Sequence, residues 1–283
     1  MSTLLSFGHG YSARTLARIL LAQGWRVIGT TRSADKAAAL CAEGTHPLIW
    51  PGADLGPALD RATHLLISAA PDDKGDPVLR LVRDEIAARA GQFAWVGYLS
   101  TTGVYGDHVG DWVDENSSLT PSTKRGLARV KAEAEWAALG VPLHIFRLAG
   151  IYGPGRGPFE KVRQRTARRI IKSGQVFSRI HVEDIAQVLA ASIARPNPGA
   201  VYNLCDDDAA PPEDVIAYAA ELLGLPVPPA EDFATAEMTP MARSFYAENK
   251  KVRNDRIKAE LGVRLTYPDY RTGLRALLAV EAQ

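Results

Sequence analysis

The feature that most constrains the fold is an alternation, over about the first 150 residues, of short apolar runs with longer segments whose apolar residues recur at helical spacing. The apolar runs lie at residues 3–7, 26–30, 47–50, 64–69, 93–100 and 142–150, and the helical segments at 13–23, 34–42, 78–90 and 122–139. Glycines suited to helix C-caps follow these segments: Gly24, Gly44, Gly91 and Gly140. Strands that are apolar at consecutive positions and separated by helices predict a doubly wound α/β fold with a parallel sheet.

The rhythm changes after about residue 150. A turn rich in Gly and Pro (150–158) leads to a basic segment that we expect to be helical, then to a strand (199–204) and further helices. We interpret the sequence as a Rossmann-type core with a small C-terminal α/β lobe over the carboxyl edge of the sheet. The core is expected to cover 1–155 plus strand segments near 176–205. The lobe, which would not fold independently, is expected to cover 156–175 and 206–283.

Composition narrows the class of partner. The chain has 33 basic and 32 acidic residues, so no overall charge attracts nucleic acid or an anionic membrane. No apolar run approaches the roughly 18 residues that span a bilayer, and the N-terminus lacks the layout of a signal peptide. Cys41 and Cys205 lie far apart without metal-ligand spacing. We therefore expect a cytoplasmic protein that binds small molecules, and no nucleic acid, membrane or metal.

The turn between the first strand and the first helix carries a G-x-G-x-x-A pattern. Gly8 permits a tight turn, Gly10 allows close approach of a pyrophosphate, and the small Ala13 lets helix touch strand. The phosphates would lie at the positive end of the helix dipole. Since the motif lies in a strand–turn–helix–strand unit, it predicts a dinucleotide site that includes Tyr11 and Ser12. The alternative is a tight connection without a ligand.

The end of the second strand predicts the choice of cofactor. NAD-selective sites usually have an acidic residue there, but this chain has Thr31 followed by Arg32. A hydroxyl and a guanidinium attract a 2′-phosphate that a carboxylate would repel. We therefore favour NADP over NAD. The alternative is that Arg32 is only a solvated charge at a strand end.

Several short motifs occur in the order and at the spacing of one known family. They are GHGYSARTLA (8–17), ADL (53–55), ISAAP (67–71), YLSTTGVYGD (98–107), FRLAGIYGPGR (146–156), FSRIHVEDIA (177–186) and VYNLCDD (201–207). In this respect the chain resembles the extended short-chain dehydrogenases/reductases, the NAD-dependent epimerase/dehydratase group. The resemblance covers nearly the whole chain.

The resemblance implies further contacts with the cofactor. Asp54 and Leu55 would contact the adenine. The segment Ser68, Ala69 and Ala70 would line the ribose and pyrophosphate, and the segment Leu148, Ala149, Gly150 and Ile151 would line the nicotinamide end.

The resemblance also implies a role for Thr101, which matches the residue that hydrogen-bonds the reacting oxygen. The alternative is a β-branched strand residue whose hydroxyl is satisfied by backbone. His181 and Asp184 match another common feature of the family, and we interpret Asp184 as mostly structural, because an acid suits a helix N-terminus.

The family's catalytic tyrosine and lysine should lie four residues apart on the helix that follows. Aligned on Gly126 and Glu133, their positions hold Arg125 and Arg129, whereas a shifted register gives Leu127 and Lys131. Neither register restores the tyrosine. A guanidinium cannot exchange protons near neutrality, although Arg125 could bind an anion. Thr102 and Gly103 replace the acidic pair of the dehydratases, so sugar-nucleotide dehydration is not expected.

Other groups could transfer the proton or bind the substrate. Tyr105 and His108, just beyond the fifth apolar run, have suitable chemistry, but such a tyrosine is usual in the family without being catalytic and such a histidine suits a solvated loop. The segment 161–172 has six basic residues and no acidic one, which indicates either an anionic substrate or a solvated helix face.

These observations predict an NAD(P)-binding atypical short-chain dehydrogenase/reductase. We expect an oxidoreductase or epimerase-like enzyme that acts on a small or nucleotide-sugar-like substrate, with Thr101 polarising the substrate and an unidentified group or water moving the proton. The alternative is a non-catalytic NADP(H)-binding sensor. The sequence leaves the oligomeric state open between a monomer and a homodimer.

Overall fold

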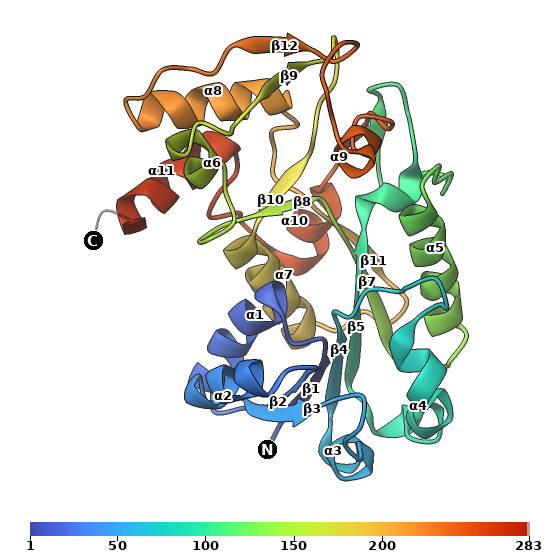
Figure 1. Ribbon diagram of the computed structural model, residues 1–283. Helices are drawn as coiled ribbons and strands as arrows, with labels where there is room; N and C mark the ends of the chain where they lie inside the picture. Colours follow the sequence, from blue (N-terminus) through green and yellow to red (C-terminus); the bar gives the residue numbers. More distant parts are fainter. Residues whose placement is uncertain (282–283) are drawn as a thin grey trace.

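The computed structural model describes residues 1–281 and is built on one seven-stranded parallel sheet (Figure 1). Along the sheet the strands are β11 (Val201–Leu204), β7 (Leu143–Leu148), β5 (Trp95–Thr101), β4 (His64–Ile67), β1 (Thr3–Phe7), β2 (Arg26–Thr31) and β3 (His46–Ile49). The strand order reverses direction between β1 and β4, and ligands of open α/β sheets bind outside the carboxyl ends of the strands at such a point. The predicted α/β, Rossmann-type sheet is confirmed.

Helices cover both faces of the sheet, because successive strand residues point to opposite sides. Leu4 faces a cluster with α1 (Tyr11–Ala22), α7 (Val182–Ala194) and α10 (Asp255–Leu261). Leu5 faces a cluster with α3 (Gly56–Arg61), α4 (Pro77–Ala87) and α5 (Lys124–Ala137). This double burial explains why the strands lack a polar alternation. The remaining helix of this part, α2 (Ala34–Ala42), packs beside β2 and β3.

Segments from the second half of the chain build a smaller lobe above the carboxyl ends of the strands (Figure 1). An apolar cluster joins α6 (Phe159–Arg163), α8 (Pro212–Leu222) and α11 (Tyr270–Glu281). Three short strand pairs and one short helix lie outside the seven-stranded sheet. They are β8 (Gly150–Tyr152) with β10 (Arg179–His181), β9 (Arg169–Ile171) with β12 (Ala230–Asp232), β6 (Trp112–Val113) with β13 (Lys251–Val252), and α9 (Pro240–Ser244).

Some predicted elements differ from the structure. The basic segment is not one helix: α6 ends at Arg163, Arg165 has a positive φ of 57°, and the chain continues as β9. Burial decides this, since Ile170 packs against Ala236 and Tyr246 in the lobe. Gly91 lies in the 3₁₀ helix η1 (Ala90–Gln92) rather than at a helix C-cap. No helix of the described residues is long and apolar enough to cross a membrane.

Candidate functional site

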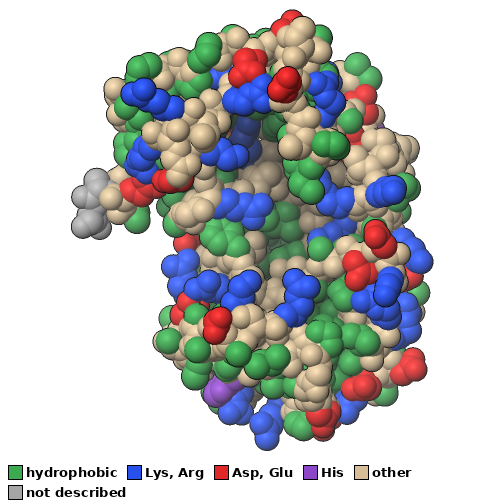
Figure 2. Space-filling view, in the orientation of Figure 1, with side chains coloured by type: hydrophobic (Ala, Val, Ile, Leu, Met, Phe, Trp, Pro, Cys, Tyr) green, Lys and Arg blue, Asp and Glu red, His purple; other side chains and the backbone are tan. Residues whose placement is uncertain are grey.

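A cavity of about 590 Å³ lies between the carboxyl edge of the sheet and the lobe. Its floor comes from the ends of β4, β5 and β7, one wall from the start of α5, and the other wall from residues 176–179 and 244–252. The space-filling view shows the hollow between the two halves of the molecule, with Lys and Arg side chains around it (Figure 2).

The glycine turn lies at the carboxyl end of β1, and its geometry requires Gly8. This residue has a φ of 74°, and a Cβ there would lie 2.8 Å from the backbone nitrogen of Ala69. The Gly8 N–H donates to Thr30 Oγ1 at 2.8 Å, which ties the turn to β2. The first glycine of the pattern therefore serves the tight passage from strand to helix, as its position predicts.

Gly10 has a different environment. It is the N-cap of α1, no side chain caps this helix, and no acid lies in its first turn. A Cβ at Gly10 would meet only Gly8 O, at 3.7 Å, so nothing in the described protein requires a glycine here. A bare helix N-terminus beside free space is suited to an anion. Ser12 lines the cavity, and Ala13 is fully buried in the core between helix and sheet.

Arg156 is a residue of this region that the sequence did not identify. It lines the cavity from the loop after β8, and its guanidinium lies over the Tyr11 ring, 6.0 Å from the centroid. The Tyr11 hydroxyl donates to Pro154 O at 2.9 Å and so joins α1 to this loop. A cation is thus placed close to the free end of α1.

The remaining predicted cofactor residues divide into two sets. Ser68 and the segment 148–151 line the cavity, while Ala69 packs against the glycine turn and Ala70 is exposed beside it. Asp54 and Leu55 lie outside the cavity lining: Asp54 accepts the Gly56 N–H at 2.9 Å, and Leu55 is buried in the core.

Thr31 and Arg32 also lie outside the cavity lining, at the carboxyl end of β2. Thr31 Oγ1 accepts the Ser33 N–H at 3.4 Å, and Arg32 is exposed without an ion pair among the described residues. His9 lies nearby on Gly29, with both ring nitrogens buried and unpartnered in the described chain. Burial, assisted by Arg14, lowers the pKa of His9 to about 4.

Thr101 ends β5 and lines the cavity. Its Oγ1 accepts the Gly103 N–H at 3.2 Å and so caps the 3₁₀ helix η2 (Thr102–Tyr105). This backbone contact is the structural role considered above, but it uses the hydroxyl as an acceptor only. The hydroxyl proton is left available for a ligand.

The start of α5 packs closely on η2, and a glycine makes this possible. A Cβ at Gly126 would lie 2.6 Å from Pro121 Cβ and 2.8 Å from Gly103 O. In this register Arg125 and Arg129 line the cavity, whereas Leu127 is exposed and Lys131 lies at the surface near Glu135. Of the two alignments considered, the structure brings the pair of arginines to the cavity and leaves the lysine outside.

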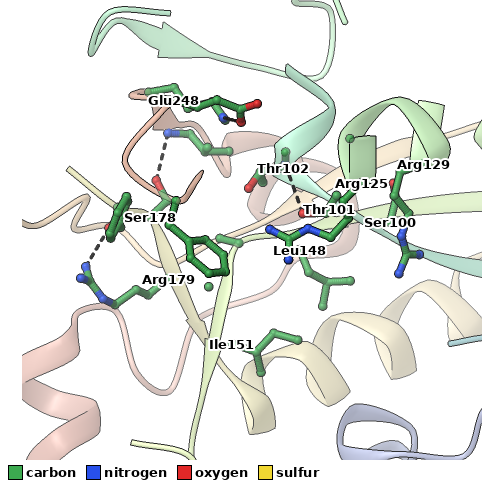
Figure 3. A pocket seen from close by; sticks show the side chains of 18 of the residues that line it. Ser100, Thr101, Thr102, Arg125, Arg129, Leu148, Ile151, Ser178, Arg179 and Glu248 are labelled. Atoms are coloured by element: carbon green, nitrogen blue, oxygen red, sulfur yellow. Dashed lines mark hydrogen bonds and ion pairs between the residues drawn. The ribbon is translucent and has the colours of Figure 1, made fainter. Parts of the chain in front are cut away.

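The two arginines of α5 have different partners. Arg129 donates to the carbonyl of Leu99 and, at 3.3 Å, to the Tyr98 hydroxyl. Arg125 is exposed, and its guanidinium lies 5.0 Å from the centroid of the Phe245 ring on the opposite wall. Figure 3 shows Arg125 pointing into the cavity near Thr101. Neither arginine forms an ion pair with a described carboxylate.

Tyr105 is not brought to the cavity, which does not support the expectation that it transfers a proton. Its ring is fully buried, and its hydroxyl donates to Asn203 at 2.7 Å and accepts from Arg147 at 3.0 Å. Burial raises the pKa of Tyr105 to about 12. His108 also lies outside the cavity lining, in a loop where its ring nitrogen contacts Tyr105 O at 3.1 Å.

Glu133, the acidic anchor of the helix motif, has a structural environment. It forms a buried ion pair with Arg147 of β7 at 2.8 Å and accepts a hydrogen bond from Ser100 of β5. These contacts hold α5 on the sheet at Ser100, the residue that precedes Thr101 in β5. Asp184 is structural in the same sense, since its oxygens accept the N–H groups of Thr266 and Tyr267 at 2.7 and 3.0 Å.

The basic segment 161–172 does not contribute to the cavity lining. Arg163 and Arg168 instead pair with Glu281 and Glu231 at the surface of the lobe. The cations that do line the cavity, besides those of α5, are Arg156, Arg179 and Lys250. They come from three separate parts of the chain, and no local pattern in the sequence identified them.

Comparisons with known proteins agree with this architecture. A functionally unknown conserved protein from Silicibacter pomeroyi is 67% identical, with full coverage of both chains and a TM-score of 0.95. A Methylobacillus flagellatus protein assigned as an NAD-dependent epimerase/dehydratase is 31% identical, covering 100% of this chain and 99% of its own, with a TM-score of 0.76. Protein YeeZ from Escherichia coli K12 is 29% identical over 95% of this chain and 97% of YeeZ.

A more distant structure shows the same fold. The human epimerase family protein SDR39U1 with NADPH is 17% identical, with a TM-score of 0.73 over 98% of this chain and 99% of its own. No family model matches the sequence. Identity of 31% over the whole length, together with the sheet order described above, establishes the relationship. The chain therefore belongs to the NAD-dependent epimerase/dehydratase family, with the fold of the extended short-chain dehydrogenases/reductases.

Proposed function

We propose that the protein is an NADP-dependent oxidoreductase or epimerase-like enzyme, and that it acts on a small molecule. In this proposal the enzyme uses no catalytic tyrosine on α5. The observation that carries this proposal is the continuity of the site. The free N-terminus of α1 opens beside a cavity that continues past Ser68 and the segment 148–151 to Thr101 and Arg125. This supports a dinucleotide along the path, because Gly10 leaves space for phosphates at the N-terminus of α1, which no side chain caps.

Particular residues of this chain would hold the dinucleotide. The backbone of 8–13 would bind the pyrophosphate, with Arg156 supplying a positive charge next to it. Ser68 and the segment 148–151 would line the path to the nicotinamide end. When bound, the nicotinamide supplies a hydride acceptor or donor.

Thr101 is proposed to orient the substrate. Its Oγ1 already accepts the Gly103 N–H, so the hydroxyl proton can donate to a carbonyl or alkoxide oxygen of the substrate. Arg129, held by Leu99 O and the Tyr98 hydroxyl, would fix the floor beside Thr101. Among the described lining residues there is no histidine, cysteine or unengaged tyrosine, since the Tyr152 hydroxyl donates to Asp269 O at 3.4 Å. We propose that water exchanges the proton.

A preference for NADP is supported by the end of β2, which has no carboxylate to repel a 2′-phosphate. Thr31, Arg32 and the helix N-cap Ser33 present hydroxyls and a free guanidinium there. The sequence of the site thus favours an anion over the hydroxyl of an unphosphorylated ribose.

The absence of a histidine, a cysteine or an unengaged tyrosine from the described lining also favours a second candidate, a non-catalytic NADP(H)-binding sensor. In that case occupancy of the cleft would change the contact between the lobe and the sheet. The sensor would bind oxidised and reduced cofactor with different affinities, coupled to a change in shape or assembly.

One experiment tests the shared basis of both candidates. Calorimetric titration of nucleotide-free protein with NADPH, NADP⁺, NADH and NAD⁺ should give at least tenfold tighter binding of the phosphorylated pair, or about 1.4 kcal/mol. Absorbance at 340 nm with a panel of carbonyl and hydroxyl substrates, and exchange of deuteride, then separate enzyme from sensor. If none of the four nucleotides binds, both candidate functions are wrong.

A further inference from the structure

The walls of the cavity have an unbalanced charge. Five basic side chains line it, namely Arg125, Arg129, Arg156, Arg179 and Lys250, against one described carboxylate, Glu248. Glu248 is already engaged, because it pairs with Lys250 at 3.0 Å and accepts the Ser122 hydroxyl at 2.9 Å. The four arginines form no ion pair with any described carboxylate. Several cations facing one cavity favour an anionic ligand.

Three of these arginines have other roles or partners. Arg156 lies at the α1 end, where the proposed function places the pyrophosphate. Arg129 is fixed by Leu99 O and the Tyr98 hydroxyl. Arg179 donates to the carbonyls of Phe177 and Ala210 at 2.7 and 3.1 Å, and in Figure 3 it lies across the cavity from Arg125.

Arg125 and Arg156 are the two cavity arginines whose guanidinium has no polar partner in the described chain, and of these Arg125 is the one on α5. Its only described interaction is a cation–π contact with Phe245, at 5.0 Å from the ring centroid. This contact uses none of the guanidinium N–H groups as hydrogen-bond donors to a protein oxygen, so two of them can bind an oxyanion in parallel. Arg125 is exposed, so water solvates its N–H groups in the free protein, and an oxyanion of a ligand would replace that water with charge-assisted hydrogen bonds.

The position of Arg125 places this donor edge at the reacting end of the cleft. Gly126, the next residue, packs against Gly103 O, and Thr101 caps the same 3₁₀ helix. The side chain of Arg125 therefore starts beside η2 and points into the cavity near Thr101 (Figure 3). A substrate oxygen at Thr101 and a second group at Arg125 would then belong to neighbouring atoms of one small molecule.

We propose that the substrate is a small acid whose carboxylate or phosphate lies next to its reacting carbon and is bound by Arg125. This inference rests on the proposed function for the position of the cofactor, but the anion site itself is formed by the protein alone. A planar fork of N–H groups selects such oxyanions over neutral analogues of the same size.

The test is calorimetric titration of the NADPH-saturated protein with oxamate and, separately, with inorganic phosphate. Saturation with NADPH blocks the N-terminus of α1, so phosphate cannot bind there. We expect at least one anion to bind, neutral lactamide to bind at least tenfold more weakly, and Arg125→Gln to weaken the anion at least tenfold. Arg125→Lys keeps the positive charge but not the planar fork of N–H groups, so its affinity for the anion should lie between that of the unmodified protein and that of Arg125→Gln. Preference for oxamate or for phosphate identifies the group as carboxylate or phosphate.

Arg165→Gln is the matched control, because Arg165 is an exposed arginine of the basic segment outside the cavity lining. It should bind the anions as the unmodified protein does. The affinity of each variant for NADPH is measured in parallel and should not change. The proposal is wrong if neither anion binds, if lactamide binds as tightly, or if Arg125→Gln binds the anion normally.

Failure of the proposed function would be visible separately. If NADPH does not bind, the anions are titrated into nucleotide-free protein and compared with Arg125→Gln and Arg156→Gln. Loss of binding only in Arg125→Gln would support the anion site although the nucleotide proposal had failed. Loss only in Arg156→Gln would place the anion at α1 and overturn the present inference.

Discussion

The two ends of the cleft are constructed in different ways. At the α1 end, backbone provides the site: a glycine with positive φ, a bare helix N-terminus, and the close packing of Gly8 on Ala69. At the α5 end, long side chains provide it, among them Arg125. Backbone geometry leaves few choices of residue, whereas a side-chain surface can change its chemistry while the fold is kept. A change of side chains at the α5 end would thus leave the backbone of the α1 end as it is.

The largest expected effect tests whether Glu133, the acidic anchor of the helix motif on α5, stabilises the fold rather than takes part in the reaction. Glu133→Gln leaves the Arg147 guanidinium buried without its carboxylate, so we expect unfolding free energy to fall by about 3–5 kcal/mol. Glu135→Gln on the same helix is the control. Its ion pairs, at 3.7 and 3.9 Å, lie near the surface and should contribute less than about 1 kcal/mol.

Urea denaturation followed by circular dichroism measures both variants. A loss below 1 kcal/mol in Glu133→Gln would show that the buried pair is not what holds α5 on the sheet.

The contrast between the two ends also explains what the sequence could predict. The α1 end was predictable because its glycines lie within one short segment between a strand and a helix. Gly8 has the positive φ and the close contact that its place in the pattern predicts. The sheet was predictable because burial on both faces gives its central strands β1, β4, β5 and β7 nearly continuous apolar runs. The helix α3 was missed because it is only six residues long.

The α5 end was predictable only in part. Sequence proposed two registers for the helix motif, and the choice between them needs the contact of Gly126 with Gly103, which no local pattern shows. Tyr105 has suitable chemistry, but tertiary packing turns its hydroxyl toward Asn203. Arg179 and Lys250 were missed because strand pairing in the lobe, rather than sequence proximity, brings them to the cavity.

Substitution of the two glycines of the turn should have different effects, one on protein stability and the other on NADPH binding. Gly8→Ala forces a side chain into a left-handed conformation and toward Ala69, so we expect a loss of at least about 2 kcal/mol in unfolding free energy. Gly10→Ala has room within the protein and an ordinary extended φ of −104°, so its stability should change by less than about 0.5 kcal/mol. Its affinity for NADPH should nevertheless fall at least tenfold, about 1.4 kcal/mol.

Thermal denaturation and calorimetry of the two variants decide this point. Normal NADPH binding by Gly10→Ala would mean that the α1 end is a tight connection and not a nucleotide site.

A pH dependence of stability is expected from His9 at the α1 end. Burial and the neighbouring Arg14 lower its pKa to about 4, while Glu43 opposes this shift. Because the unfolded chain takes up the proton near pH 6.5 and the folded chain does not, stability is complete above pH 6.5 and falls as pH decreases toward 4. Between pH 7.5 and pH 5 we expect His9 to lower the free energy of unfolding by about 1–2 kcal/mol.

Urea titrations at several pH values should show a smaller loss in His9→Gln, whatever its absolute stability. His46→Gln, at an exposed position, is the control and should keep the pH dependence of the unmodified protein. If His9→Gln and the unmodified protein lose the same free energy over this range, the buried ring does not titrate as described.

The smallest expected effect concerns the phosphate that distinguishes NADP from NAD. Arg32 is exposed at the end of β2, so its contact with a 2′-phosphate would be screened by solvent and worth about 1 kcal/mol. Arg32→Ala should therefore weaken NADPH roughly fivefold, leave NADH unchanged, and reduce the dependence of NADPH affinity on salt. Arg26→Ala, at the other end of the same strand, should change none of these. Equal weakening of NADPH and NADH would mean that Arg32 contacts a part common to both nucleotides, and the preference for NADP would then have to arise elsewhere at the α1 end.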